Sequence, residues 1–142
     1  MRRHFISFFI IFMVGGLPML AQKRGKFDPV KFEADLEQFI TIEARLTTKE
    51  ASLFLPKYRE MRKKQLVYFK EARNFNHVDI NNEKACADAI RRRDKNDMEI
   101  KRLQQKYHEK FLEILPASKV FLVLKAENKF HRQLFKKGDN RH

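Results

Sequence analysis

Apolar residues recur every three or four positions along most of the chain, which is the spacing of amphipathic helices. The first such segment after residue 27 opens with Asp28-Pro29, an N-cap residue followed by proline at the first helical position. Its apolar face is formed by Phe32, Leu36, Phe39 and Ile40. The pattern predicts a first helix that starts at residue 29.

A second helix is predicted after Leu46. Thr47 and Glu50 have the spacing of a capping box, in which each side chain pairs with the backbone of the other residue. Pro56 lacks a backbone donor, so we expect a kink at that point. The apolar positions that follow at helical spacing are Phe54, Tyr58, Met61 and Phe69.

Two more helices follow a loose, asparagine-rich segment over residues 74–82, where Asp79 is the expected N-cap. The third helix should run to about Ile114 and carry Cys86, Ile90, Met98, Tyr107 and Phe111 on its apolar positions. A tight corner over residues 115–118 should lead into the fourth helix, which we expect to fray after Lys137. The fourth helix carries Val120, Val123, Leu124, Phe130 and Leu134.

No glycine occurs between Gly25 and Gly138, so the turn residues that a sheet requires are missing. We therefore expect an all-α domain over residues 22–142, with four helices. A third helix on the order of 50 Å long cannot be wrapped by the remaining chain. The sequence thus predicts an elongated hairpin assembly with a kinked second helix, which buries its remaining apolar face in a homodimer.

Residues 1–21 have the organisation of a secretory signal peptide. Arg2 and Arg3 precede an uncharged stretch, and Ala21 follows the helix breakers Gly15, Gly16 and Pro18. The uncharged stretch is shorter than the roughly 20 residues of a membrane span, although an uncleaved anchor is the alternative. We expect export and cleavage before Gln22. Cys86 is the only cysteine, so an intrachain disulfide is excluded; a small buried apolar role is the simplest one, and an intermolecular disulfide is the alternative.

The net charge of +13 implies an acidic partner. Acids outnumber bases over residues 28–50, whereas bases dominate afterwards in clusters with interleaved aromatic residues. For an exported protein we expect client proteins rather than nucleic acid, with anionic membrane surfaces as a secondary possibility. The candidate client-binding residues are Tyr58, Arg59, Arg62, Lys63, Phe69, Arg92 and Arg93.

The sequence favours neither an enzyme nor a cofactor-binding protein. A phosphate-binding loop would need glycines that are absent, and nothing in the spacing places a histidine beside Cys86. Asp94 and Asp97 lie among arginines, as on a solvated ion-pair face. Glu127 and His131 are four residues apart and are weak candidates for metal ligands; the simpler interpretation is a Glu127–lysine pair with no metal.

Two helix openings, Leu46-Thr47-Thr48-Lys49-Glu50 and Leu115-Pro116-Ala117-Ser118-Lys119, resemble the paired motifs of the Spy/CpxP family of small exported helical stress proteins. The segments from Phe54 through Pro56 to Tyr58, and from Glu127 to Phe130, are similar to the form found in Bacteroidetes-type members. Glu50 stands where the family usually has Gln, and Pro116 where it usually has Thr.

This resemblance implies a cradle-shaped dimer with a basic concave face, located in the periplasm. It implies an ATP-independent chaperone that binds unfolded or stress-exposed proteins. The alternative that it also implies is an envelope-stress or metal-responsive regulator, which docks on a membrane sensor or an anti-sigma system.

Overall fold

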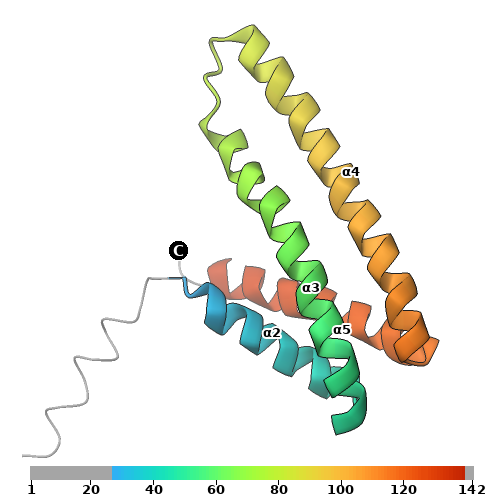
Figure 1. Cartoon of the computed structure of the whole chain (residues 1–142). Coiled ribbons are helices and arrows are strands. Elements are labelled where there is room, and N and C mark those ends of the chain that lie inside the picture. Colours follow the sequence, from blue (N-terminus) through green and yellow to red (C-terminus); the bar gives the residue numbers. More distant parts are fainter. Residues whose placement is uncertain (1–26, 140–142) are drawn as a thin grey trace, which may run out of the picture. The chain divides into compact units, whose positions relative to one another are not determined.

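The computed structural model describes residues 27–139, so the predicted signal peptide lies outside the described residues. In this described part, four α-helices follow one another: α2 (Pro29–Glu43), α3 (Thr48–Ala72), α4 (Glu83–Ile114) and α5 (Ala117–Asp139), with the short 3-10 helix η1 (Arg73–His77) after α3 (Figure 1). Residues 27–139 contain no strand, which confirms the predicted all-α class. Over the same residues, no helix is both long and apolar enough to span a membrane.

The chain divides into two compact units, Met1–Ala34 and Asp35–His142. In the first unit, the described residues are the beginning of α2. There the Asp28 carboxylate accepts hydrogen bonds from the backbone N–H groups of Val30 and Lys31, at 3.0 and 3.2 Å. Asp28 is therefore the N-cap that the sequence predicts. The packing described below belongs to the second unit.

The other helix starts confirm one prediction and correct another. The capping box of α3 is formed, because the Thr47 hydroxyl accepts from the Glu50 N–H while the Glu50 carboxylate accepts from the Thr47 N–H. The cap of α4 is Asn82, whose Oδ1 accepts from the Ala85 N–H at 3.0 Å. The prediction of Asp79 was wrong, because its carboxylate accepts from the Asn81 N–H in the preceding turn.

The link from α2 to α3 turns sharply at Arg45, which has a φ of +54°. The Arg45 N–H donates to the Ile42 carbonyl oxygen and the Leu46 N–H to the Thr41 carbonyl oxygen, at 3.1 and 3.0 Å. This pair of bonds is the Schellman arrangement, in which a left-handed residue closes the helix end. Arginine takes the position that glycine usually occupies.

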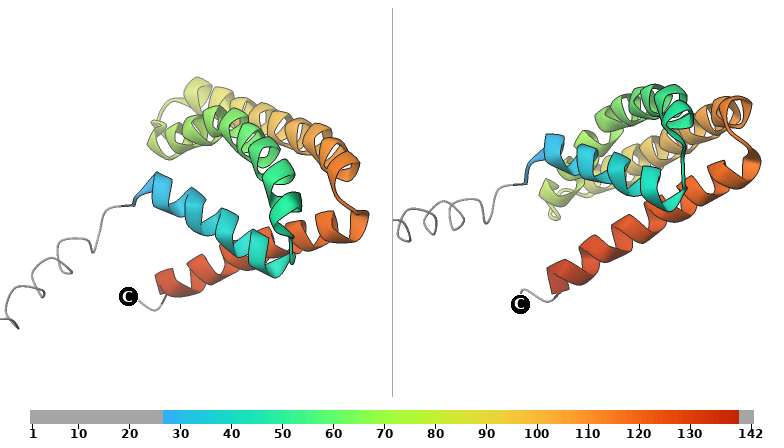
Figure 2. Two further views of the ribbon diagram at one scale, coloured as in Figure 1. Left: turned by 60° about the horizontal axis from the view of Figure 1, so that its bottom comes forward. Right: turned by 90° about the horizontal axis from the view of Figure 1, so that it is seen from below.

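Helices α3 and α4 run antiparallel and side by side, and α5 turns back from the end of α4 (Figures 1 and 2). Helix α3 runs without a break through Pro56, and its ribbon curves along its length (Figure 2). The later part of α2 contacts α5, where the rings of Phe39 and Phe130 lie 5.4 Å apart. These helices of the second unit enclose its core. Helix α5 stays helical to Asp139, beyond the predicted fraying point at Lys137.

The core lies where α3, α4 and α5 meet. Phe54, Tyr58, Tyr107 and Phe111 are fully or almost fully buried, and the Phe54 and Phe111 rings meet edge to face at 4.8 Å. Such contacts add to the stabilisation from burial alone. Helices α2 and α5 complete this core with the aliphatic side chains of Leu36, Ile40, Val120, Val123 and Ala126.

The outer half of the α3–α4 hairpin is packed differently. Between residues 62 and 106 the buried side chains are two polar ones, Gln65 and Asn96. Two helices alone cannot enclose an apolar interior, because each has a wide face open to water. Exposed apolar side chains therefore remain on the outer hairpin: Leu66, Val67, Phe69, Ile80, Ile90 and Met98.

Candidate binding surface

A row of cationic and apolar side chains runs along the outer half of α3. Arg59, Arg62, Leu66 and Phe69 of α3 and Arg73, the first residue of η1, are separated by three, four, three and four residues, so they follow one face of this helical segment. We call this row the α3 stripe. The fractional exposures of Leu66 and Phe69 are 43% and 38%, so apolar surface is available between the arginines.

Two of the arginines in the α3 stripe are held in place by contacts with neighbouring side chains. The Arg62 guanidinium carbon lies 5.8 Å from the centre of the Phe69 ring, within the range of a cation–π interaction. Arg59 forms an ion pair with Glu37 of α2. The stripe thus begins at a neutralised arginine next to α2 and continues onto the hairpin, where its apolar residues are exposed. Lys63 is exposed one helical turn after Arg59 and flanks the stripe.

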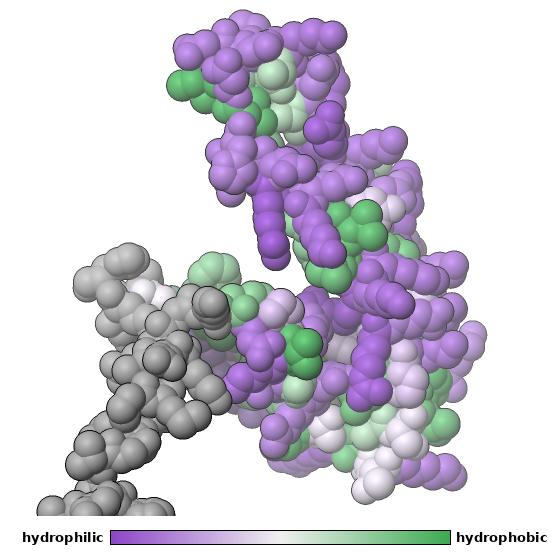
Figure 3. Space-filling view, turned by 60° about the vertical axis from the view of Figure 1, so that its left-hand side comes forward, coloured by the Kyte–Doolittle hydropathy of each residue, from purple (hydrophilic) through white to green (hydrophobic). Residues whose placement is uncertain are grey.

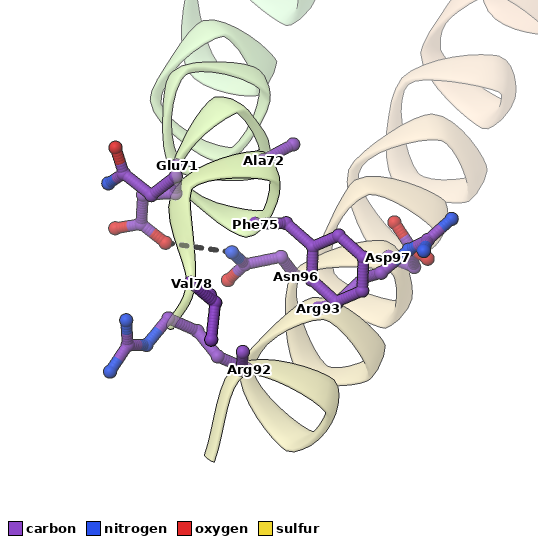
Figure 4. Close-up of a pocket in the computed structure, with 10 residues that line it drawn as sticks. Glu71, Ala72, Phe75, Val78, Arg92, Arg93, Asn96 and Asp97 are labelled. Atoms are coloured by element: carbon purple, nitrogen blue, oxygen red, sulfur yellow. Dashed lines mark hydrogen bonds between the residues drawn. The ribbon is translucent and has the colours of Figure 1, made fainter. Parts of the chain in front are cut away.

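Arg92 and Arg93 lie elsewhere, at a small hollow near the tip of the hairpin (Figure 4). The Arg93 guanidinium carbon is 4.7 Å from the centre of the Phe75 ring. Asn96 donates a 2.8 Å hydrogen bond to the Glu71 carboxylate across the hairpin. Apart from Tyr58, the predicted client-binding residues therefore form two groups on the same hairpin.

The space-filling view shows the character of this surface. On the hairpin, green apolar patches are separated by purple polar side chains (Figure 3). Exposed apolar patches framed by charged side chains are a feature of interaction surfaces.

Tyr58 does not belong to this surface. It has no exposed area, and its hydroxyl donates a 3.1 Å hydrogen bond to the Glu127 carboxylate of α5. The prediction that Tyr58 contacts a client was wrong, because the ring is part of the core. The sequence signal for burial was present, since Tyr58 continues the helical row of Phe54 and Met61.

Glu127 is a mostly buried carboxylate, and burial raises its pKa. The hydrogen bond from Tyr58 and the positive charge of Arg62 oppose this rise. The suggested pairing of Glu127 with a lysine was wrong, because its partner is the tyrosine hydroxyl. Glu127 thus connects α5 to α3 directly beneath the α3 stripe.

The two motif-bearing helix openings meet in space. The Lys119 ammonium of α5 forms an ion pair with Glu50 of α3 and donates a 2.9 Å hydrogen bond to the Arg45 carbonyl oxygen. At the start of α5 the Pro116 carbonyl oxygen accepts hydrogen bonds from the Lys119 and Val120 N–H groups. Among the other motif residues, Leu115 and Phe54 are buried, while Leu46 and Phe130 are partly buried. These motifs therefore perform a structural role.

The proposed metal ligands are not assembled into a site. Glu127 is bonded to Tyr58, whereas His131 lines a shallow hollow beside Lys125 and Arg132. Positive charges next to an imidazole oppose cation binding. Over residues 27–139 no group of three or more His, Cys, Asp or Glu side chains is placed to hold a metal ion.

Cys86 lies near the start of α4, where its sulfur is 3.5 Å from the Asp79 carbonyl oxygen. The side chain is partly exposed rather than buried, which corrects the expected buried role. His108 lies 22 residues further along the same helix, a separation of about 33 Å. Cys86 and His108 therefore cannot form a nucleophilic pair.

No protein-family model, curated protein or solved structure matches this chain.

Proposed function

We propose that this protein is an exported, ATP-independent chaperone that holds non-native polypeptides on the α3 stripe. The observation that carries the proposal is the arrangement of Arg62, Leu66, Phe69 and Arg73, in which half-exposed apolar side chains are framed by arginines. Unfolded chains offer apolar side chains together with acidic groups, and this stripe complements both.

The two kinds of side chain have different tasks. The net positive charge attracts acidic segments over a distance and raises the rate of encounter. Leu66 and Phe69 then give weak apolar contacts that do not depend on a defined sequence. Because the apolar row is only two residues long, a bound segment dissociates readily and can fold in solution.

Two further parts of the proposal follow from the sequence. The leader over residues 1–21 directs export to the periplasm. The protein is a homodimer, in which the second copy covers exposed apolar side chains outside the α3 stripe, such as Ile80 and Ile90. A monomer at micromolar concentration, measured by sedimentation, would contradict the dimer without affecting the α3 stripe.

The test is suppression of aggregation of a chemically unfolded, acidic protein after dilution. We expect substoichiometric amounts of the chain to reduce light scattering, with no change on addition of ATP. The variant Phe69→Ser with Arg73→Glu should lose most of this effect. Thermal unfolding followed by circular dichroism tests whether the variant remains folded.

A matched control is available on the outward face of α4. Lys95→Glu with Met98→Ser also removes one cation and one exposed apolar side chain, and it should retain the activity. Absence of suppression by the unaltered protein at several-fold excess would refute the chaperone proposal. Equal loss in both double variants would show that general surface charge, rather than the α3 stripe, is responsible.

A further inference from the structure

Helix α5 has a second regular row of side chains on the face opposite its buried one. Phe121, Lys125, Asn128, Arg132 and Phe135 are spaced by four, three, four and three residues. This is the spacing of a seam along which another helix packs. We call this row the α5 seam.

The apolar ends of the seam are strongly exposed. The fractional exposures of Phe121 and Phe135 are 62% and 76%. They are 14 residues apart, so the two rings are separated by about 21 Å along the helix. The seam therefore offers an aromatic contact at each end and a cationic centre.

The charge of this face is one-sided. Among residues 117–138 of α5 the acidic residue is Glu127, which points into the core and bonds to Tyr58. Lys129, at the edge of the face, is held in an ion pair with Glu43, and Lys119, on the buried side of the helix, is held in an ion pair with Glu50. Over the described part of the chain, Lys125 and Arg132 in the centre form no such pair.

The outward face of α4 shows that this arrangement is not general in the molecule. Its cations alternate with acids, and two of them form ion pairs along the helix, Arg91 with Asp88 and Arg102 with Glu99. Acidic residues of α4 itself therefore neutralise the positive charge of that face. The α5 seam contains no acidic residue, so carboxylates that pair with its cations have to come from another molecule.

We propose that the α5 seam is a docking site for an acidic amphipathic helix of another protein. Carboxylates in the middle of the partner would pair with Lys125 and Arg132, and apolar side chains about 14 residues apart would contact Phe121 and Phe135. The Lys125 ammonium lies 5.8 Å from the Phe121 ring centre, so a carboxylate and an apolar side chain would meet adjacent groups. The shallow hollow between Lys125, Arg132 and Phe135 would receive part of this helix.

A lipid surface fits the seam less well. The apolar side chains that an interfacial helix inserts into the membrane are used in the core here, including Val120, Val123 and Phe130. Two rings separated by three polar positions leave no continuous apolar face to insert. This site is independent of the α3 stripe, so the two proposals can fail separately.

The test uses the full chain and a designed, fluorescently labelled helical peptide of about 18 residues. The peptide has leucines at its two ends at the seam spacing and glutamates at the three intervening seam positions. We expect saturable, salt-sensitive binding by fluorescence anisotropy. The same peptide with lysines in place of the glutamates should not bind.

Double variants test whether the peptide binds at the α5 seam. Lys125→Glu with Arg132→Glu should weaken binding of the acidic peptide by about tenfold or more, and should gain binding of the lysine peptide. Phe121→Ser with Phe135→Ser should also weaken binding of the acidic peptide. Lys84→Glu with Lys95→Glu on α4 is the control for total charge and should bind the acidic peptide as the unaltered chain does.

Three outcomes would overturn the proposal. The first is equal loss in the α4 control, which would indicate general charge attraction. The second is binding to anionic phosphatidylglycerol vesicles that depends on Phe121 and Phe135, without binding to the peptide. The third is loss of self-association in the Lys125 and Arg132 variant without peptide binding, which would assign the seam to a second copy of the chain.

Discussion

Lys119 and Glu50 join the starts of α5 and α3, although 69 residues separate them in the sequence. The same ammonium also bonds to the Arg45 carbonyl oxygen at the end of α2. One side chain thereby connects three helix ends, and two short motifs that are far apart in the sequence form one structural joint.

Replacement of Lys119 by Met should lower the melting temperature at neutral pH, because the link between these helix ends is lost. The hydrogen bond from Lys119 holds the pKa of Glu50 below 4.5, with the Thr47 backbone N–H contributing. A lowered pKa gives stability that is present above pH 4.5 and lost as the pH falls through the pKa of the folded state. The difference between the variant and the unaltered protein should therefore shrink on acidification, measured by thermal unfolding. A constant difference would contradict the role of Glu50.

Glu127 should give the opposite pH dependence. Because burial raises its pKa above 4.5, the protonated form fits the folded state, and stability falls as the pH rises through that pKa. Glu127→Gln keeps an acceptor for Tyr58 and removes the buried charge. It should increase the free energy of unfolding at neutral pH by on the order of 1 kcal/mol and flatten its pH dependence. Lower stability of this variant in urea unfolding at neutral pH would show that the attraction to Arg62 dominates.

Two neighbouring residues of α4 should contribute very differently to stability, because one lies in the aromatic core and the other is half exposed. Phe111→Ala removes a buried ring that contacts Phe54 and should cost about 3–5 kcal/mol. Leu112→Ala, one residue further, changes a half-exposed side chain and should cost less than about 1 kcal/mol. Denaturant unfolding of the two variants measures both values. Similar costs would mean that Leu112 is covered, for example by a second copy.

The outer hairpin should open more readily than its base. Backbone amides over residues 66–100 should exchange with deuterium faster than those over residues 107–126, because buried apolar contacts are concentrated in the second range. Gln65→Leu with Asn96→Leu replaces the two buried polar side chains and should slow exchange in the outer half. Uniform exchange along α4 would contradict this division.

The sequence predicts the helices well because their signals are local. The N-cap at Asp28 and the capping box of Thr47 and Glu50 depend on residues within one turn. The cap of α4 was assigned to Asp79 rather than Asn82, because both residues can cap and both lie in one turn. Local chemistry alone does not choose between them.

The surface was harder to predict because it depends on which helix covers which face. Tyr58 and Phe69 are both aromatic residues near arginines, yet α5 covers the first and leaves the second half exposed. The α5 seam was missed, although its spacing is visible in the sequence. Its signal is that Glu127 is the acidic residue among residues 117–138 of α5, and the structure shows that Glu127 points inward.

The unequal packing of the hairpin has a mechanical consequence. A base closed by packed aromatic rings resists deformation, while an outer half whose buried side chains are Gln65 and Asn96, with Asn96 hydrogen-bonded to Glu71, yields more easily to an applied load. The hairpin therefore has a stiff base and a compliant outer end, so its curvature can change while the base stays folded.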